Sequence, residues 1–282
     1  MELKEALLYE KLNDGQVRCH LCNHRCKILP SYRGICGVRE NRDGILYSLV
    51  YGLVIAEHID PIEKKPLFHV LPGSKTCSIA TAGCNFRCTF CQNHEISQVR
   101  LCKDMIVGRE TTPEEIVDRA QASGCASVAY TYTEPTVYFE FAYECCRLAH
   151  AKKLKNVFVS NGYMTEEAVE MIAPYLDGAN IDLKAFTETF YKRECGAGLN
   201  PVLETLKQMK EQGIWLEITT LLIPGLNDDV SELKQLADFI YSLGPETPWH
   251  LSRFHPCYEM TDIEPTPLSK IHQAVQSGKE AG

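Results

Sequence analysis

The chain has 282 residues, of which 45% are hydrophobic and 23% are charged, a composition that excludes disordered, collagen-like and coiled-coil proteins. The net charge of −8 has the wrong sign for a protein held mainly by nucleic-acid phosphates. The most apolar window, Ser127–Cys146, carries three glutamates and predicts no membrane span, and the charged start Met1–Leu12 differs from a signal peptide. We therefore expect a cytoplasmic protein that binds neither nucleic acid nor membrane.

Residues 1–75 predict a small separate module. We expect a short helix over Leu3–Leu12, then a segment rich in Cys, Gly and Arg, and then hairpin-like strands over Ile45–Glu57. A loop, Asp60–Pro66, leads to the turn at Leu71–Gly73.

Four cysteines of this module are spaced like metal ligands, at Cys19, Cys22, Cys26 and Cys36. Cytosolic thiols stay reduced, so clustered cysteines are metal ligands more often than disulfides. Our first interpretation is a closed tetrahedral site with Zn or a single Fe, and a second cubane cluster is the next. Zinc would serve only to fold a segment that has little core, whereas a redox role requires iron.

From residue 76 to 282, apolar runs of strand type alternate with segments of helical period. The expected strands are Cys77–Ala82, Ser127–Tyr132, Asn156–Ser160, Ala179–Leu183, Trp215–Leu221 and His250–Phe254. The expected helices are Pro113–Ala122, Thr136–Lys152, Thr165–Tyr175, Pro201–Gln212, Asp229–Ser242 and Leu268–Gln276. This alternation predicts an α/β fold, a partial six-stranded TIM-like β/α barrel, with its chemistry at the carboxyl ends of the strands.

A loop with three cysteines follows the first of these strands, with Cys84, Cys88 and Cys91 in the pattern C-x3-C-x2-C. Three thiolates can hold a [4Fe-4S] cluster that normally takes four, which leaves one iron open for a substrate or cofactor. The alternative is zinc, which would need a fourth ligand such as His94. The position of the loop after the first strand of a β/α series favours the cluster.

With this triplet in that position, the chain resembles the radical S-adenosylmethionine (SAM) superfamily. The resemblance implies a [4Fe-4S] cluster and SAM as cofactors, with Phe90 packing near the adenine. It also implies that Glu134, which follows Thr133 at the end of the second strand, receives the methionine amine. A carboxylate suits an ammonium partner.

Two further strand ends resemble the pyruvate formate-lyase activating enzymes. Ser160-Asn161-Gly162 ends the third strand, and Asp182-Leu183-Lys184 ends the fourth. The resemblance implies that Lys184 pairs with the methionine carboxylate, that Asp182 and Ser160 contact ribose or a bound cation, and that Asn161 lines the same pocket. His255, after the sixth strand, falls where that family has a SAM-contacting His. Val159 stands where the activating enzymes carry Asp, which departs from their cation site.

Over its full length the chain resembles the radical SAM enzymes of the AmmeMemoRadiSam system, through the four-cysteine module, Asp60–His69, Thr81–Phe86 and Trp249–Pro256. The resemblance implies AMMECR-type and Memo-type partner proteins and a flavodoxin- or ferredoxin-type reductant. Members often continue beyond the position of Gly282, so one interpretation is that the sequence is a fragment.

Three functions follow as hypotheses. The first is a radical SAM oxidoreductase that forms a 5'-deoxyadenosyl radical and abstracts hydrogen from a protein or peptide, like a glycyl-radical activase. The second applies the same chemistry to a small metabolite or to a side chain of a partner. The third is a non-enzymatic iron-sulfur electron carrier, which the pocket residues Glu134 and Lys184 argue against, since a carrier needs no zwitterion pocket.

Overall fold

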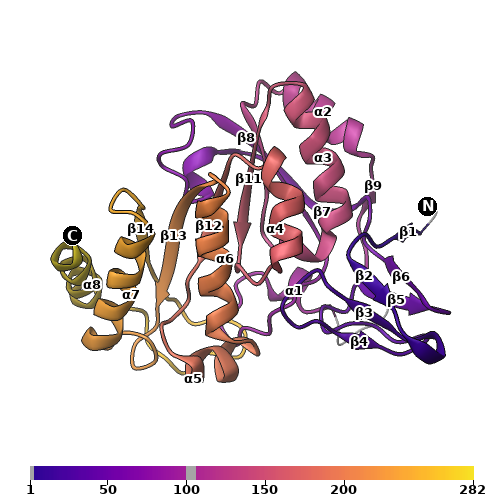
Figure 1. Cartoon of the computed structure of the whole chain (residues 1–282). Helices are drawn as coiled ribbons and strands as arrows, with labels where there is room; N and C mark the ends of the chain where they lie inside the picture. The colour runs from indigo at the N-terminus through magenta and orange to yellow at the C-terminus, as the bar shows by residue number, and fades with distance from the viewer. Residues whose placement is uncertain (1–2, 100–105) are drawn as a thin grey trace.

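An eight-stranded sheet organises the computed structural model, which describes residues 3–99 and 106–282 (Figure 1). Six strands are parallel and form the partial barrel. They are β8 (Lys75–Thr81), β10 (Ser127–Tyr130), β11 (Lys155–Ser160), β12 (Gly178–Asp182), β13 (Trp215–Leu222) and β14 (Trp249–Arg253). The predicted α/β class and partial barrel are thus confirmed. Two antiparallel strands, β7 (Leu53–Pro61) and β9 (Arg109–Glu110), extend the sheet beyond β8.

Helices connect the parallel strands, as the alternation predicts. The longer ones are α2 (Pro113–Ala122), α3 (Phe139–Ala151), α4 (Glu166–Ile172), α6 (Leu199–Glu211), α7 (Val230–Leu243) and α8 (Leu268–Ala281). Short helical turns are η1 (Asn13–Gly15), η2 (Ile62–Lys64), α1 (His94–Ser97), η4 (Pro135–Tyr138), η5 (Ala173–Tyr175), α5 (Glu188–Phe190) and the π-helix η6 (Tyr191–Cys195). Two of these helices have a side-chain N-cap that the sequence also predicts, since Thr112 and Thr165 each precede two glutamates in the first turn: the Thr112 side chain accepts from the backbone N–H of Glu115, and that of Thr165 accepts from the backbone N–H of Ala168.

Residues 3–50 form two small sheets at the end of the molecule opposite α8 (Figure 1). Their strands are β1 (Lys4–Glu5), β2 (Tyr9–Lys11), β3 (Val17–Cys19), β4 (Lys27–Ile28), β5 (Arg39–Arg42) and β6 (Ile45–Ser48). The helix expected over Leu3–Leu12 is wrong, because β1 pairs with β6 and β2 pairs with β3. Tertiary strand pairing here overrides a helical preference that is too short to be stable alone.

The sheet and the hydrophobic core both continue across residue 75, where the sequence predicts a boundary. β7 lies before this residue, yet it pairs with β8 from Val54 to Pro61. Val17 and Val38 of the N-terminal part belong to the same cluster of buried side chains as Ile79 and Val128 of the barrel. The four-cysteine region therefore packs on the barrel through a shared core.

The loop after β7 closes the amino-terminal end of the barrel, and we call residues 62–70 the plug loop. Ile62 and Leu67 pack against Ala129 of β10 and Val157 of β11. Farther along, the backbone N–H groups of residues 68 and 69 donate to the carboxylate of Glu217 on β13, at 3.0 and 2.9 Å. The plug loop thus forms the floor of the space enclosed by the strands.

No helix in the part of the chain that the structure describes is both long and apolar enough to cross a membrane.

Candidate functional site

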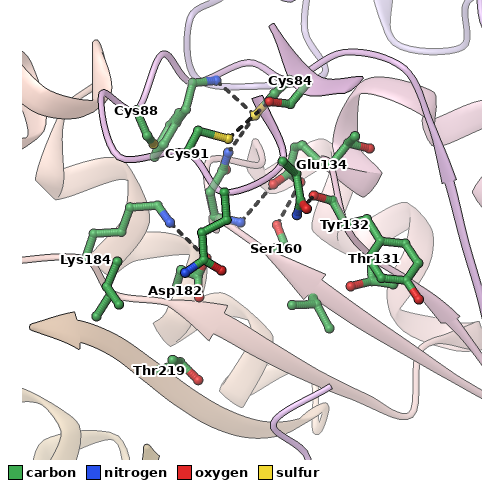
Figure 2. A pocket seen from close by; sticks show the side chains of 18 of the residues that line it. Cys84, Cys88, Cys91, Thr131, Tyr132, Glu134, Ser160, Asp182, Lys184 and Thr219 are labelled. Atoms are coloured by element: carbon green, nitrogen blue, oxygen red, sulfur yellow. Dashed lines mark hydrogen bonds and ion pairs between the residues drawn. The ribbon is translucent and has the colours of Figure 1, made fainter. Parts of the chain in front are cut away.

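The three cysteines of the loop after β8 line one cavity of about 400 Å³ at the carboxyl ends of the parallel strands (Figure 2). Ligand sites of proteins have volumes in this range. Seven of the eight expected cofactor residues line the same cavity, namely Phe90, Thr133, Glu134, Ser160, Asn161, Asp182 and Lys184. His255 is exposed and does not line it.

Tight backbone geometry holds the cysteine loop in place. Gly83 has φ +100°, and a Cβ atom at this position would lie 2.6 Å from the side chain of Val38. The backbone N–H of Arg87 donates to the carbonyl of Cys195 at 2.7 Å, and that of Thr89 donates to Glu194 at 2.9 Å. The loop is therefore fixed at one end against the N-terminal region and at the other against the π-helix η6.

The thiols of the loop differ in their surroundings. Burial raises the pKa of Cys84 well above its ordinary value, and the nearby carboxylate of Glu134 raises it further. A hydrogen bond with the thiol of Cys195 lowers the pKa of Cys88. Cys91 lies 3.2 Å from the hydroxyl of Ser97, measured between Sγ and Oγ. The shared hydrogen bond with Cys195 thus distinguishes Cys88 from the other two thiols of the loop.

The donor set fits an iron-sulfur cubane. Across residues 3–99 and 106–282, no three His, Cys, Asp or Glu side chains are grouped as a site for one metal ion. A cubane does not require such convergence, because each thiolate binds a different iron. The amide of Asn161 lies 3.8 Å from the sulfur of Cys84, and the backbone N–H of Phe86 donates to that sulfur at 3.4 Å. Donors of this kind stabilise a sulfur that carries negative charge.

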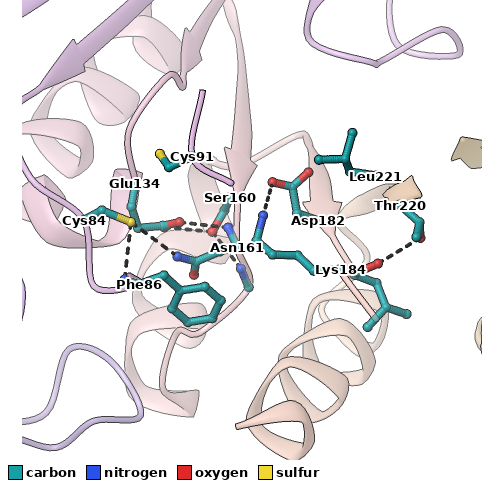
Figure 3. Close-up of polar contacts among 12 residues, drawn as sticks. Cys84, Phe86, Cys91, Glu134, Ser160, Asn161, Asp182, Lys184, Thr220 and Leu221 are labelled. Carbon is teal, nitrogen blue, oxygen red and sulfur yellow. Dashed lines mark hydrogen bonds and ion pairs between the residues drawn. The ribbon is translucent and has the colours of Figure 1, made fainter. Parts of the chain in front are cut away.

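A buried hydrogen-bond network surrounds the carboxylate of Glu134, which is 1% exposed (Figure 3). Its Oε1 accepts from the backbone N–H and hydroxyl of Thr136, at 3.0 and 2.6 Å, and from the hydroxyl of Ser160 at 2.8 Å. Its Oε2 accepts from the backbone N–H of Asn161 at 2.8 Å. Two carboxylate oxygens offer about four lone-pair sites, so Oε2 retains room for one more donor. Burial raises the pKa of Glu134, although these donors oppose the shift.

An ion pair lies across the cavity from Glu134 (Figure 3). The Lys184 ammonium donates to Asp182 at 2.8 Å and stands 5.9 Å from the centre of the Phe90 ring. Burial disfavours the charge of this lysine, but Asp182 and the thiols of Cys88 and Cys195 outweigh burial and raise its pKa well above the ordinary value. Lys184 is therefore a permanent cation beside the cysteine loop.

Sequence reasoning missed several residues that line or adjoin the cavity. Lys65 and Tyr132 line it, and Asn85 accepts a hydrogen bond of 2.7 Å from Asn161. Cys195 was not missed, because its place beyond the fourth strand makes it a candidate for a thiol near the pocket, with a passive buried thiol as the alternative. It is buried beside Cys88, in the π-helix. Lys65 belongs to the segment Asp60–His69 that carries part of the family resemblance. The sequence does not show that this side chain reaches the cavity, because that position depends on how the plug loop folds.

The four cysteines of the N-terminal region line a second, small cavity of about 20 Å³, together with the guanidinium of Arg39. Cys19 and Cys36 are buried, and Cys22 and Cys26 are partly buried. The sequence motif thus brings all four thiols to one place, next to a buried positive charge.

Comparisons with known proteins agree with this site. Residues 78–240 match the Radical SAM superfamily. The uncharacterized protein MJ0808 of Methanocaldococcus jannaschii is 47% identical over 99% of this chain and 83% of its own length. The pyruvate formate-lyase-activating enzyme of Clostridium pasteurianum is 24% identical over 61% of this chain and 71% of its own length. Among solved structures, SuiB of Streptococcus suis bound to S-adenosylmethionine is similar, with a TM-score of 0.56, 16% identity, and coverage of 71% of this chain and 45% of SuiB.

Proposed function

The chain belongs to the radical SAM superfamily, and we propose that it cleaves SAM reductively and uses the resulting radical to abstract hydrogen from a substrate. Family membership implies a [4Fe-4S] cluster and SAM. When bound, these groups would supply the electron and the 5'-deoxyadenosyl radical. The observation that carries the proposal is that one cavity is lined by Cys84, Cys88 and Cys91 together with the strand-end side chains Glu134, Asp182 and Lys184.

The side chains around the cavity suit the two charged ends of a methionine group. Lys184 offers an ammonium to its carboxylate, and the remaining lone-pair site on Glu134 Oε2 would accept from its amine. Phe90 supplies an apolar wall for the adenine, while Asp182 and Ser160 provide polar groups for the ribose, with Asn161 beside them. The sequence also indicates His255 as a SAM contact, and it would have to come from outside the cavity described.

Two substrate classes stay open within this proposal. A protein or peptide substrate, as for a glycyl-radical activase, is supported by the similarity to a pyruvate formate-lyase-activating enzyme. A small molecule is supported by a different observation, since Ile62 and Leu67 of the plug loop close the amino-terminal end of the barrel and Lys65 of the same loop lines the cavity. We propose classification as an oxidoreductase for either substrate class, because both reactions begin with abstraction of a hydrogen atom. AMMECR-type and Memo-type proteins are the partners that we propose on resemblance.

We propose further that the N-terminal cavity holds a second metal, Zn or Fe, through Cys19, Cys22, Cys26 and Cys36. These thiols line one cavity but are not grouped closely enough in the described structure to hold one ion, so the proposal requires them to move together when the metal binds. Thiolates suit both metals. If the metal is iron, this site lies on a route for electrons from a flavodoxin- or ferredoxin-type reductant. If it is zinc, it stabilises the region that packs on the cysteine loop.

Electron paramagnetic resonance (EPR) spectroscopy tests the cofactor proposal. The anaerobically reconstituted protein, reduced with dithionite, is expected to give a [4Fe-4S] signal that shifts when SAM is added, because SAM would bind the iron that no cysteine holds. A Cys22→Ser variant serves as the matched control and should keep this shift. A signal that SAM leaves unchanged in the parent protein would contradict the proposal.

A further inference from the structure

The cavity extends beyond the residues assigned to SAM, down to the plug loop. Lys65 of this loop is 2% exposed and lines the cavity, as does Thr219 of β13, which is 9% exposed. In Figure 2 the three cysteines lie at the top of the view and Thr219 at the bottom, with Asp182 between them. We call Lys65, Tyr132 and Thr219 the cavity floor.

The charges at the cavity floor do not cancel. The carboxylate of Asp60 accepts from the ammonium groups of Lys64 and Lys65, at 2.8 and 2.7 Å, and from the hydroxyl of Tyr132 at 2.6 Å. Two cations therefore share one anion, so Asp60 neutralises the enclosed Lys65 only in part. The Lys64 side chain is 63% exposed and can be hydrated, whereas that of Lys65 is enclosed.

Lys65 also has a hydrogen-bonding capacity that its neighbours do not fill. Its ammonium carries three N–H groups, and it contacts Asp60 and, at 3.3 Å, the hydroxyl of Tyr132. The centre of the Tyr132 ring lies 4.3 Å from the Lys65 ammonium. Tyr132 itself has φ +62°, a backbone conformation that costs energy in residues other than glycine. The third N–H remains for an acceptor in the cavity.

Thr219 is a second, independent indication that a polar ligand binds here. Its hydroxyl oxygen is buried and has no hydrogen-bond partner within the described parts of the chain. Buried polar groups are normally satisfied, because leaving one unsatisfied destabilises the folded state. The Thr219 side chain lines the cavity, so rotation about its Cα–Cβ bond would turn the hydroxyl toward a bound group.

We propose that the cavity floor binds the carboxylate of a small-molecule substrate, with Lys65 as its cation and the Thr219 hydroxyl as a further donor. Because Asp60 already neutralises part of the charge of Lys65, a carboxylate with one negative charge suits this site better than a phosphate dianion. A small molecule fits better than a peptide because the plug loop closes this end of the barrel. The inference rests on the proposed function only in treating the occupant as the molecule from which hydrogen is abstracted.

Calorimetric titration of the reconstituted protein with SAM bound tests this inference, with acetate as the probe and acetamide as its neutral analogue. Acetate is expected to bind saturably, and acetamide at least tenfold more weakly. Lys65→Met should weaken acetate binding by about 10- to 100-fold, the range for a charge-assisted hydrogen bond. Lys75→Met, which removes the same charge from an exposed position outside the cavity, should leave acetate binding unchanged.

Thr219→Val provides a variant that keeps the shape of the floor and all of its charges. It should weaken acetate binding several-fold without lowering the free energy of unfolding, because the lost hydroxyl has no partner in the described protein. Equal binding of acetate and acetamide, or unchanged acetate binding in Lys65→Met, would overturn the inference. An equal loss of SAM and acetate binding in that variant would also overturn it, since the floor would then belong to the SAM site. These binding measurements do not depend on radical chemistry. If the protein bound acetate as expected but did not cleave SAM, the proposed function would be refuted and the carboxylate site would stand.

Discussion

An ion pair buried between the N-terminal region and the barrel offers a sharp test of how the two parts are held together. Arg39 of β5 is 2% exposed and Glu140 of α3 is fully buried. The guanidinium donates twice to the carboxylate, from Nη1 to Oε2 at 2.9 Å and from Nη2 to Oε1 at 2.6 Å. The backbone N–H of Leu7 donates to Oε1 as well, at 3.0 Å. One carboxylate thus serves two segments of the N-terminal region.

Glu140→Gln removes the negative charge while nearly preserving the shape of the side chain. The guanidinium of Arg39 then stays buried without a counter-charge, so we expect the free energy of unfolding to fall by about 3–5 kcal/mol. Arg39→Met should cost a similar amount, because it leaves the carboxylate unpaired. The double variant should lose at least about 2 kcal/mol less than the sum of the two, since neither buried charge remains.

Equilibrium urea denaturation of the three variants and the parent protein measures these free energies. Lys4→Met serves as the control, because it removes a pair with Glu144 that is about one third exposed on each side and is expected to cost less than about 1 kcal/mol. Single-variant losses below about 1 kcal/mol, or strictly additive losses, would refute the reasoning that this pair is buried and mutually dependent.

Four further predictions concern the metal sites, the SAM pocket and the floor of the barrel. Cys88→Ala should hold fewer than about four iron atoms at the barrel by iron analysis, because the cubane loses one of only three thiolate ligands. Full iron content in this variant would count against the loop as the cluster site. Glu134→Gln should retain iron but bind SAM about 1.5–3 kcal/mol more weakly by calorimetry, because the methionine amine loses a charged acceptor, and unchanged affinity would place the amine elsewhere. Cys22→Ser should lose one metal ion and keep the barrel cluster by elemental analysis, whereas loss of both would show that the sites depend on each other. Burial opposes the charge of Glu217, but hydrogen bonds from His250, Phe68 and His69 outweigh burial and lower the pKa of this carboxyl from 4.5 to about 2. The ionised carboxylate therefore stabilises the folded state above pH 4.5, and this contribution is lost as the pH falls toward 2. Acid unfolding of Glu217→Gln should therefore depend less on pH across this window than that of the parent protein.

The barrel could be predicted from sequence because its signals are local. Each of the six expected strands lies within two residues of an observed one, and the helix Pro113–Ala122 has the expected bounds, since Thr112 caps it and Pro113 begins it. Parallel β/α order then brings the strand ends to one edge of the sheet. That order is why Glu134, Ser160 and Lys184, which are distant in sequence, line one cavity with the cysteine loop.

Other features depend on long-range pairing that local patterns do not report. The Leu3–Leu12 segment forms strands because β6 and β3 supply partners for its backbone. The plug loop reaches the cavity because β7 runs antiparallel to β8 and carries Asp60 and Lys65 under the barrel. The contact of Cys195 with Cys88 arises from the π-helix between β12 and α6, whose extra residue has no clear signature in sequence.

Reductive cleavage of SAM tests the central claim most directly. The anaerobically reconstituted protein, given SAM and dithionite, should release 5'-deoxyadenosine and methionine in equal amounts, measured by liquid chromatography with mass spectrometry. The Cys88→Ala variant should release neither above background, while Cys22→Ser should still release both. Absence of both products from a parent protein that holds about four iron atoms at the barrel and binds SAM would contradict the account, as would undiminished cleavage by Cys88→Ala.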